Sequence, residues 1–373
     1  MTHDLRPHPP LQLSGTPLPL VDRARVYVCG VTPYDVTHLG HAATYVWVDA
    51  ATRVLRHIGV QTEVVRNVTD VDDVLTDAAR RANTPYDAYA AMHQYQFDHD
   101  MSALSVRRPD HEPRAHRYIP QVIALAQALL DKDDAYVREG SVYFRGAKVP
   151  GDSGLSADEA SALCREYGDE PDDPRKEHSF DVPVWRASTG DQPSWPSPWG
   201  VGRPGWHAEC SAMALSVLGS SVDLHAGGHD LRFPHHAYEA AQAEAATGVR
   251  PFARAWMHVG TVCVGGQKMA KSTGNLVLVD TLLADHRAAA VRLLLLDRAW
   301  HEPWDFDTAL LDAAEQRLDA LYAAAGRRSD DETSEEAVVD ALLADLDVPR
   351  ALAIAEESGG RAARTLAAVL ALT

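Results

Sequence analysis

The apolar residues in the N-terminal part of the chain follow a strand–helix–strand pattern. Residues 25–30 (RVYVCG) form a short hydrophobic run that ends in a glycine, and residues 62–68 (TEVVRNV) form a second one. Between them, residues 42–57 carry apolar side chains at helical spacing. Two strands joined by a helix predict a parallel α/β sheet. The loop NVTDVDD then brings three aspartates to the end of the second strand, the edge at which open α/β sheets bind ligands.

The rest of the chain divides into an inserted segment, a second α/β stretch and a helical tail. The pattern predicts helices at 73–98 and 119–130, a strand at 140–146 and an irregular, charged stretch at 151–186. It then predicts a helix at 210–218, a strand and turn at VDLHAGG, a helix at 238–246 and strands in WMHVGTVCVGG. Beyond residue 279 the sequence is rich in Ala and Leu and predicts helices, with a polar break at 327–336. We therefore expect an α/β domain over 1–280 with an insertion at about 98–186, and a helical domain over 281–373.

Composition and charge limit the partners that we expect. The 373 residues have ordinary globular composition and a net charge of −18, and no apolar run approaches the ~20 residues that span a bilayer. The polar, Pro-rich N-terminus lacks an apolar signal region, so we expect a cytoplasmic protein. The four cysteines, far apart in the sequence, are then expected to be thiols or metal ligands. We expect no membrane partner, and a monomer.

The first chemical motif is His38-Leu39-Gly40-His41, at the start of the predicted helix. Free backbone N–H groups at a helix N-terminus favour anions, and a glycine lets a flat ligand approach the backbone. Taken alone, two histidines in a tetrapeptide more often belong to a solvated surface. The motif therefore needs a second signal before it indicates a phosphate site.

That second signal is the segment QKMAKSTGN, which carries Lys268 and Lys271 between glycines. Two lysines in such a segment suit a loop that closes over a polyphosphate, although a solvated turn is an equally good interpretation of the segment alone. An HLGH motif after the first strand together with a KMxKS motif after a late one resembles the two-part signature of class I aminoacyl-tRNA synthetases. The two motifs together indicate this family much more specifically than either motif does alone.

A third group of residues suits a metal ion. Two cysteines, a histidine and a carboxylate offer the S, N and O ligands that Zn²⁺ accepts. They are Cys29, Cys210, His235 and Glu239. Individually, Cys210 fits a buried structural cysteine and His235 a hydrogen-bonded core histidine. Glu239 fits either a fourth ligand or a carboxylate on a helix surface.

Five stretches, taken in order, resemble the cysteinyl-tRNA synthetase family. They are CGVTPYD…HLGH, NVTDVDD, GWHAECSAM, DLHAGGHDLRFPHH and KMAKSTGN, and the resemblance covers residues 26–278. TPYDVTHLGHAATY, PSWPSPWGVGRPGWH and STGNLVLV are more similar to a branch of that family, the mycothiol-pathway cysteine ligases. These enzymes join cysteine to the amine of glucosaminyl-inositol without tRNA. The resemblance implies a Rossmann-like parallel sheet with an inserted connective segment and a C-terminal helical domain.

The resemblance also implies roles for individual residues. His38 and His41 would contact ATP phosphates, Lys268 and Lys271 the leaving pyrophosphate, and Mg²⁺ would arrive with ATP. Thr32 is expected near the phosphates and Asp230 on the ribose or adenosine. Gly30, Thr69 and Trp206 would hold the amino and carboxylate groups of L-cysteine. Helix capping is an equally good interpretation of Thr69, and a better one of Asp72 and Asp73, while Trp206 also fits core packing.

The sequence departs from the family pattern in two places. One lies in the lysine loop, and the other lies among the metal-binding residues and bears on the choice of acceptor. Ala270 stands where the family has Ser, so we expect weaker positioning of the loop with its chemistry retained. Glu239 and His225 resemble the tRNA synthetase, whereas the ligase branch usually holds zinc with two Cys and one His.

We expect an ATP-driven ligase that forms cysteinyl-adenylate and transfers cysteine to an aminosugar–inositol acceptor. The alternatives are a cysteinyl-tRNA synthetase and a ligase for another small amine. About 95 residues follow the lysine loop, and residues 301–373 carry 16 Asp and Glu against 6 Arg, a balance of −10. Such a tail disfavours an added tRNA-reading module.

Overall fold

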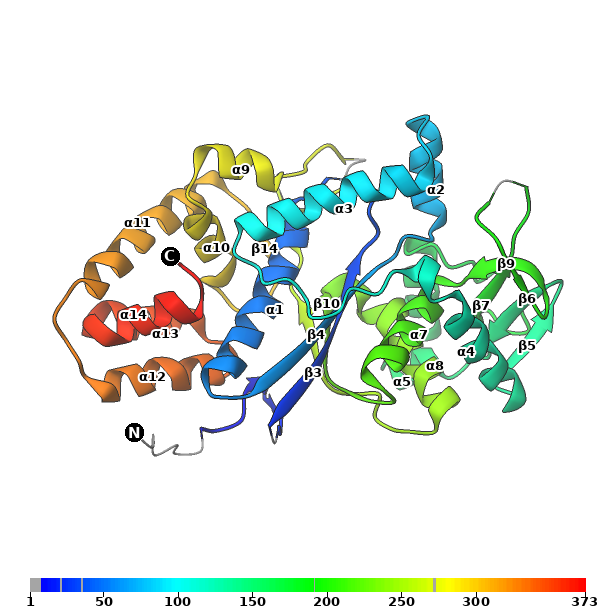
Figure 1. The fold of residues 1–373 in the computed structure, drawn as a ribbon, viewed down its shortest axis with the longest axis horizontal. Coiled ribbons are helices and arrows are strands. Elements are labelled where there is room, and N and C mark those ends of the chain that lie inside the picture. Colours follow the sequence, from blue (N-terminus) through cyan, green and yellow to red (C-terminus); the bar gives the residue numbers. More distant parts are fainter. Residues whose placement is uncertain (1–7, 21, 35, 191, 271–272) are drawn as a thin grey trace.

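Three structural regions lie side by side along the molecule. The structure is a computed structural model that describes residues 8–20, 22–34, 36–190, 192–270 and 273–373. A parallel sheet occupies the centre, a group of C-terminal helices lies at one end, and a small antiparallel sheet with its helices lies at the other (Figure 1). The expected α/β fold with a helical C-terminal part is confirmed.

The central sheet has four strands in the order β11–β10–β3–β4, and every neighbouring pair is parallel. The strands are β3 (Arg23–Val31), β4 (Gln61–Val68), β10 (Val222–Gly228) and β11 (Ala253–Val259). All four therefore end at the same edge, and the loops that follow them meet there.

The alternation of side chains along β3 separates two cores. Val26 and Val28 pack with α1 (Leu39–His57), whereas Tyr27 and Cys29 belong to a second cluster that includes residues of α7 (Trp206–Leu218). Successive side chains of a strand point to opposite faces, so this division follows from the strand's period of two. It also aims Cys29 towards α7.

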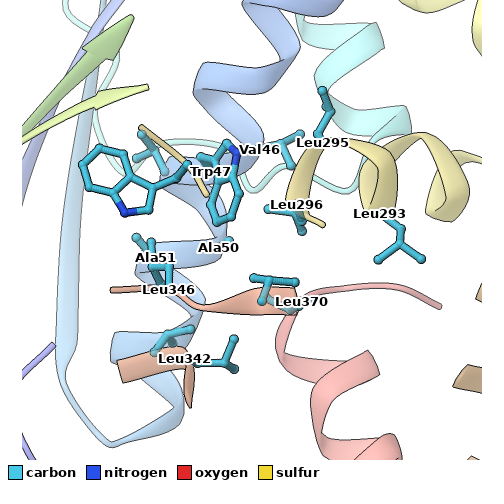
Figure 2. Close-up of a cluster of buried hydrophobic side chains, with 14 of the residues drawn as sticks. Val46, Trp47, Ala50, Ala51, Leu293, Leu295, Leu296, Leu342, Leu346 and Leu370 are labelled. Carbon is cyan, nitrogen blue, oxygen red and sulfur yellow. The ribbon is translucent and has the colours of Figure 1, made fainter. Parts of the chain in front are cut away.

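The buried face of α1 joins the sheet to the C-terminal helices. Figure 2 shows side chains of α1 together with side chains from α10 (Ala288–Leu296) and from the chain beyond residue 340, all of which belong to one buried cluster. The labelled residues are Val46, Trp47, Ala50, Ala51, Leu293, Leu295, Leu296, Leu342, Leu346 and Leu370. Burying this apolar face contributes about 25 cal/mol of folding free energy for each Å² removed from water. The C-terminal helices share one hydrophobic core with α1, so they are part of the main core.

Further elements outside the central sheet are the C-terminal helices, three short strands that form a small sheet, and a two-stranded hairpin. The helices are α9 (Val279–Asp285), α11 (Thr308–Ala325), α12 (Glu332–Leu343), α13 (Val348–Ser358) and α14 (Gly360–Val369). The short strands are β12 (Val262–Val264), β13 (Gln267–Lys268) and β14 (Trp304–Asp305), in the sheet order β13–β12–β14, and β1 (Gln12–Leu13) pairs with β2 (Thr16–Pro17). Across the described part of the chain, none of the helices combines the length and the apolar character that a membrane span requires.

The inserted region contains a five-stranded sheet in the order β5–β6–β7–β9–β8, with every pair antiparallel. The strands are β5 (Ala135–Arg138), β6 (Ser141–Phe144), β7 (Val182–Ala187), β8 (Trp195–Ser197) and β9 (Gly200–Pro204). The helices of this region are α4 (Ile119–Asp131), α5 (Val149–Asp152) and α6 (Ala157–Glu166). Helices α7 and α8 (Ala237–Thr247) pack both on this region and on the central sheet. The sheet thus continues past the expected boundary at residue 186.

Two expectations about the elements need correction. The stretch 151–186 is rich in loops, as expected, but it also contains α6, and β7 begins in it at Val182. The helix expected over 73–98 is two helices, α2 (Asp73–Arg81) and α3 (Tyr86–Ala103). The break falls at Asn83, which has φ of 51°, and Pro85, which cannot continue a helix from the preceding residues.

Candidate functional site

Four residues from four elements meet in a buried cluster beside the central sheet. Cys29 lies near the end of β3, Cys210 in α7, His235 in the π-helical turn η3 (Arg232–His236) and Glu239 in α8. One ligand atom from each lies within 4.8 Å of the others, and all four residues are buried. The structure therefore brings together the metal set that the sequence indicated.

Glu239 is the shared acceptor of this cluster. Its Oε1 accepts a hydrogen bond from Cys29 Sγ at 3.1 Å and lies 2.7 Å from His235 Nε2. Its Oε2 lies 2.8 Å from His225 Nε2. The side chain of Glu239 is 0% exposed, so its interpretation as a helix-surface carboxylate was wrong.

The protonation of the cluster reflects charges that have been removed from water. Burial and a hydrogen bond to Cys210 raise the pKa of Cys29 well above its usual value. Burial alone would raise the pKa of Cys210, but the hydrogen bond from Cys29 and the charge of His235 outweigh it and lower that pKa to about 6. Burial disfavours the charged form of His235, but the Glu239 and Cys210 charges raise its pKa to about 10. Cys210 and Glu239 are thus held as anions beside a single imidazolium, that of His235, and the excess negative charge favours a further cation.

A zinc ion fits this donor set. Two thiols, an imidazole and a carboxylate at this spacing are ligands that Zn²⁺ accepts, and buried thiolates are compensated by a bound cation. A second set at the same spacing combines Cys29 and Glu239 with His225 and His236. The set with Cys210 is the better one because it supplies two sulfur ligands, and His225 already holds the other oxygen of Glu239.

Further histidines surround the cluster and orient it. His235 Nδ1 lies 2.9 Å from His207 Nδ1, and His207 Nε2 lies 3.2 Å from Asp169 Oδ2. His236 Nδ1 lies 2.9 Å from His258 Nε2. Such outer groups fix the tautomer and orientation of the ligating side chains. The sequence alone does not indicate these roles of His207, His236 and His258, because the three residues come from three separate elements.

The HLGH motif forms the start of α1, as expected. His38 is the N-cap, and its Nδ1 accepts a hydrogen bond from the N–H of Gly40 at 3.2 Å. The rings of His38 and His41 stack with their centroids 3.8 Å apart. A Cβ at Gly40 would lie 3.0 Å from the His38 ring, so the glycine leaves room for the histidine cap. The motif therefore places two imidazoles at a helix N-terminus.

The HLGH motif and the lysine loop are held together by backbone hydrogen bonds. Leu39 N donates to Val277 O at 2.8 Å, and Val279 N donates to Thr37 O at 3.1 Å. These bonds join the residues around His38 to the segment that follows the loop. The two halves of the signature, far apart in the sequence, are thus neighbours in space.

Lys268 of the loop contacts the residue expected on the nucleotide. Its Nζ donates to Asp230 Oδ2 at 2.7 Å and lies 5.4 Å from the ring centroid of Tyr167. Burial disfavours the ammonium, but the Asp230 carboxylate outweighs it and raises the pKa of Lys268. Ala270 N donates to Asn275 Oδ1 at 3.0 Å. Lys271 lies outside the described residues.

Gly30 and Thr69 are linked at the sheet edge through one asparagine. Gly30 N donates to Asn67 Oδ1 at 2.7 Å, and Asn67 Nδ2 donates to Thr69 Oγ1 at 3.0 Å. The N-cap of α2 is Asp72, which accepts from Val74 N at 2.7 Å, so capping explains Asp72 and not Thr69.

Trp206 and Thr32 also lie at this edge. Trp206 is the first residue of α7, and its ring stacks on His235 with centroids 4.2 Å apart. It is half-buried, so core packing alone does not account for it. Thr32 directly follows β3 and is half-buried, and its carbonyl accepts from Tyr34 N at 2.9 Å.

Comparison with known families decides the relationship. The family described as tRNA synthetases class I (C) catalytic domain matches residues 19–316. The chain belongs to this family. Its membership, with its relatives, makes it an ATP-dependent amino acid ligase, and the expected resemblance to the class I synthetases and to the cysteine ligases is confirmed.

Two kinds of relatives align with this family member. An L-cysteine:1D-myo-inositol 2-amino-2-deoxy-alpha-D-glucopyranoside ligase of Acidothermus cellulolyticus is 45% identical over 341 residues, which are 90% of this chain and 84% of that protein. A cysteine–tRNA ligase of Alkalilimnicola ehrlichii is 44% identical over 301 residues, which are 80% of this chain and 65% of that protein. The sequence identity to the two relatives is thus nearly equal, but the alignment with the glucosaminyl-inositol ligase is longer.

A solved structure with the same fold is the methionyl-tRNA synthetase of Mycobacterium tuberculosis in complex with methionyl-adenylate. The TM-score is 0.64 at 18% identity, over 94% of this chain and 82% of that one. The class I synthetase fold is thereby confirmed.

Proposed function

We propose that this protein is a zinc-dependent ligase that activates L-cysteine with ATP and transfers it to the amine of glucosaminyl-inositol. The observation that carries the proposal is the buried Cys29–Cys210–His235–Glu239 cluster, which lies at the edge of the sheet that also carries the HLGH motif. The choice of acceptor rests on the relatives, because the alignment with the glucosaminyl-inositol ligase extends over 341 residues and that with the tRNA ligase over 301.

Activation joins the carboxylate of cysteine to the α-phosphorus of ATP and releases pyrophosphate. Negative charge gathers on the phosphate oxygens in this step, and fixed donors and cations stabilise it. His38 and His41 would contact the phosphates at the N-terminus of α1, with Thr32 nearby. Lys268 and Lys271 would bind the pyrophosphate, with Mg²⁺ arriving with ATP. Lys268 would exchange its contact with Asp230 for the pyrophosphate, which frees Asp230 to bind the ribose or adenosine.

The metal cluster would select cysteine over serine. A bound zinc ion supplies an open coordination position that prefers a thiolate to a hydroxyl. Cys29, Cys210, His235 and Glu239 would hold it, and Trp206, stacked on His235, would close one side of the pocket. Gly30 and Thr69, tied together through Asn67, would hold the amino and carboxylate groups of the substrate.

Transfer of cysteine to tRNA is the second candidate function. The 44% identity to cysteine–tRNA ligases supports it, as do Glu239 and His225 at the cluster. The two functions share the activation step and differ only in the acceptor.

A two-stage assay tests the proposal. We expect ATP–pyrophosphate exchange that depends on cysteine, with serine at least 100-fold less effective because a hydroxyl is a poor zinc ligand. We then expect a cysteine amide from glucosaminyl-inositol and no charging of tRNA. Equal exchange with serine would contradict the role of zinc in selection, and charging of tRNA without amide formation would contradict the acceptor.

A further inference from the structure

A histidine–carboxylate dyad lies at the same sheet edge, and the proposed activation step does not use it. Asp70 Oδ2 lies 2.6 Å from His116 Nδ1, and Asp70 Oδ1 accepts from the backbone N–H of His116 at 3.0 Å. The Asp70 side chain is 7% exposed and that of His116 is 37% exposed. A carboxylate on Nδ1 fixes the tautomer with the lone pair on Nε2, and in the described part of the chain no hydrogen bond engages that nitrogen.

The dyad lies next to the residues proposed to bind cysteine. Asp70 directly follows Thr69 in the loop after β4, and His116 lies in the short helical turn η1 (Ala115–Arg117). Residue 114 bridges to Val68, which brings η1 to the end of β4. Ala115 packs in the same buried cluster as Cys29 and Cys210. His116 therefore directly follows, along the chain, a residue of the core that contains Cys29 and Cys210.

A polar cavity of about 280 Å³ lies at the start of α2, three residues along the chain from Asp70. Its lining includes Asp73, the first residue of α2, together with Arg203 and Gln192 from the antiparallel region, and Arg203 donates to Asp73 at 2.8 Å. Carboxylate, guanidinium and amide groups are the partners that hydroxyl groups need. A hydroxyl-rich acceptor would find space and hydrogen-bonding groups in this cavity, and the start of α2 connects it to the loop that holds Asp70.

The transfer step needs a general base, whereas the activation step does not. In activation a carboxylate oxygen attacks phosphorus, and no proton has to leave. In transfer the amine nitrogen attacks the carbonyl carbon of the adenylate, the N–C bond forms, and the bond from that carbon to the AMP oxygen breaks. The nitrogen must then lose one proton, and AMP leaves with the electron pair of the broken bond. A positioned base accelerates such a step by about 10²–10⁴-fold.

We propose that His116 is the general base of the transfer step and that Asp70 is its positioning residue. His116 Nε2 takes the proton from the attacking amine and passes it to solvent through its exposed edge. The inference rests on the proposed function, since it assumes an amine acceptor. Asp70 also interacts electrostatically with Tyr86 of α3 and Glu209 of α7, the ionisable groups that face it from the neighbouring helices.

The test compares the two half-reactions in His116→Asn, which retains a donor at the position of Nδ1 and removes the base. We expect pyrophosphate exchange and zinc content within about threefold of the wild type. We expect single-turnover transfer from preformed cysteinyl-adenylate to glucosaminyl-inositol to fall about 100-fold or more. The decline of the transfer rate towards low pH should disappear in the variant, and added imidazole should restore part of the rate.

His111→Gln is the matched control. His111 Nε2 lies 3.0 Å from Glu63 Oε1, so this is a second histidine–carboxylate pair on the same segment, away from the carboxyl end of β4. The His111→Gln substitution should leave both half-reactions unchanged. Transfer by His116→Asn at the wild-type rate and with the wild-type pH profile would overturn the role of the dyad alone. Failure of the wild type to form the amide would instead overturn the proposed function.

Discussion

Glu239 is the residue at which the metal proposal can be tested most directly. Its Oε1 lies beside Cys29 and His235, and its Oε2 is held by His225. Glu239→Gln preserves the shape of the side chain but removes its charge. We expect zinc affinity to fall by more than the 10–100-fold that is typical of changes in outer groups, measured by competition with a chromophoric chelator.

Glu244→Gln provides the control for this change, since it is the same substitution on the same helix. Glu244 accepts from Phe252 N at 2.9 Å and lies outside the metal cluster. The zinc affinity of the Glu244→Gln variant should equal that of the wild type. If Glu239→Gln also binds zinc as the wild type does, Glu239 is not a ligand and the site consists of Cys29, Cys210 and His235.

At the scale of residues, motifs revealed the candidate metal ligands but not the side chains that orient them. Cys29 and Cys210 stand in segments whose spacing and family resemblance are visible in the sequence. The contact of His207 with both His235 and Asp169 depends on how α7, η3 and the inserted region pack. No periodicity of one segment encodes such a contact, so it could not be predicted.

At the scale of elements, strong hydrophobic periodicity was sufficient to predict a helix or strand from the sequence, and weak periodicity was not. The pattern predicted β3, α1 and β4 because each buries a continuous apolar face. It missed α6, a short helix with only two buried residues, Ala160 and Cys164. The signal that could have identified it is the capping box, in which Ser156 and Glu159 exchange side-chain and backbone hydrogen bonds.

The capping box leads to a prediction about α6. Ser156→Ala removes the acceptor of the Glu159 N–H, and the loss of such a cap costs about 1 kcal/mol. Amide hydrogen exchange in α6 should therefore become several times faster, while pyrophosphate exchange stays unchanged. Ser161→Ala, inside the same helix, should leave protection equal or slightly higher because alanine is the better helix former. Equal protection in Ser156→Ala would contradict the stabilising role of the cap.

At the scale of the whole molecule, one buried ion pair connects the catalytic sheet to the helical tail. Arg292 of α10 forms an ion pair with Asp49 of α1 and donates to Leu104 O at 2.9 Å and Leu370 O at 2.6 Å. Its side chain is 1% exposed. Asp49 also accepts from Arg53 Nε at 2.6 Å. The guanidinium group of Arg292 thus contacts three parts of the chain: α1, the end of α3 and the end of α14.

Removing one partner of this pair should destabilise the molecule strongly. Arg292→Met keeps an apolar stem of similar length, but it leaves Asp49 with one charged partner fewer and two carbonyl groups without a donor. Loss of one partner of a buried pair costs about 3–5 kcal/mol, which urea unfolding should detect as a lower midpoint. The double variant Asp49→Asn/Arg292→Met should lose less than the sum of the two single variants, because the residues share one interaction. Additive losses, or a loss of less than about 1 kcal/mol for Arg292→Met, would show that the tail is held to α1 by apolar packing alone.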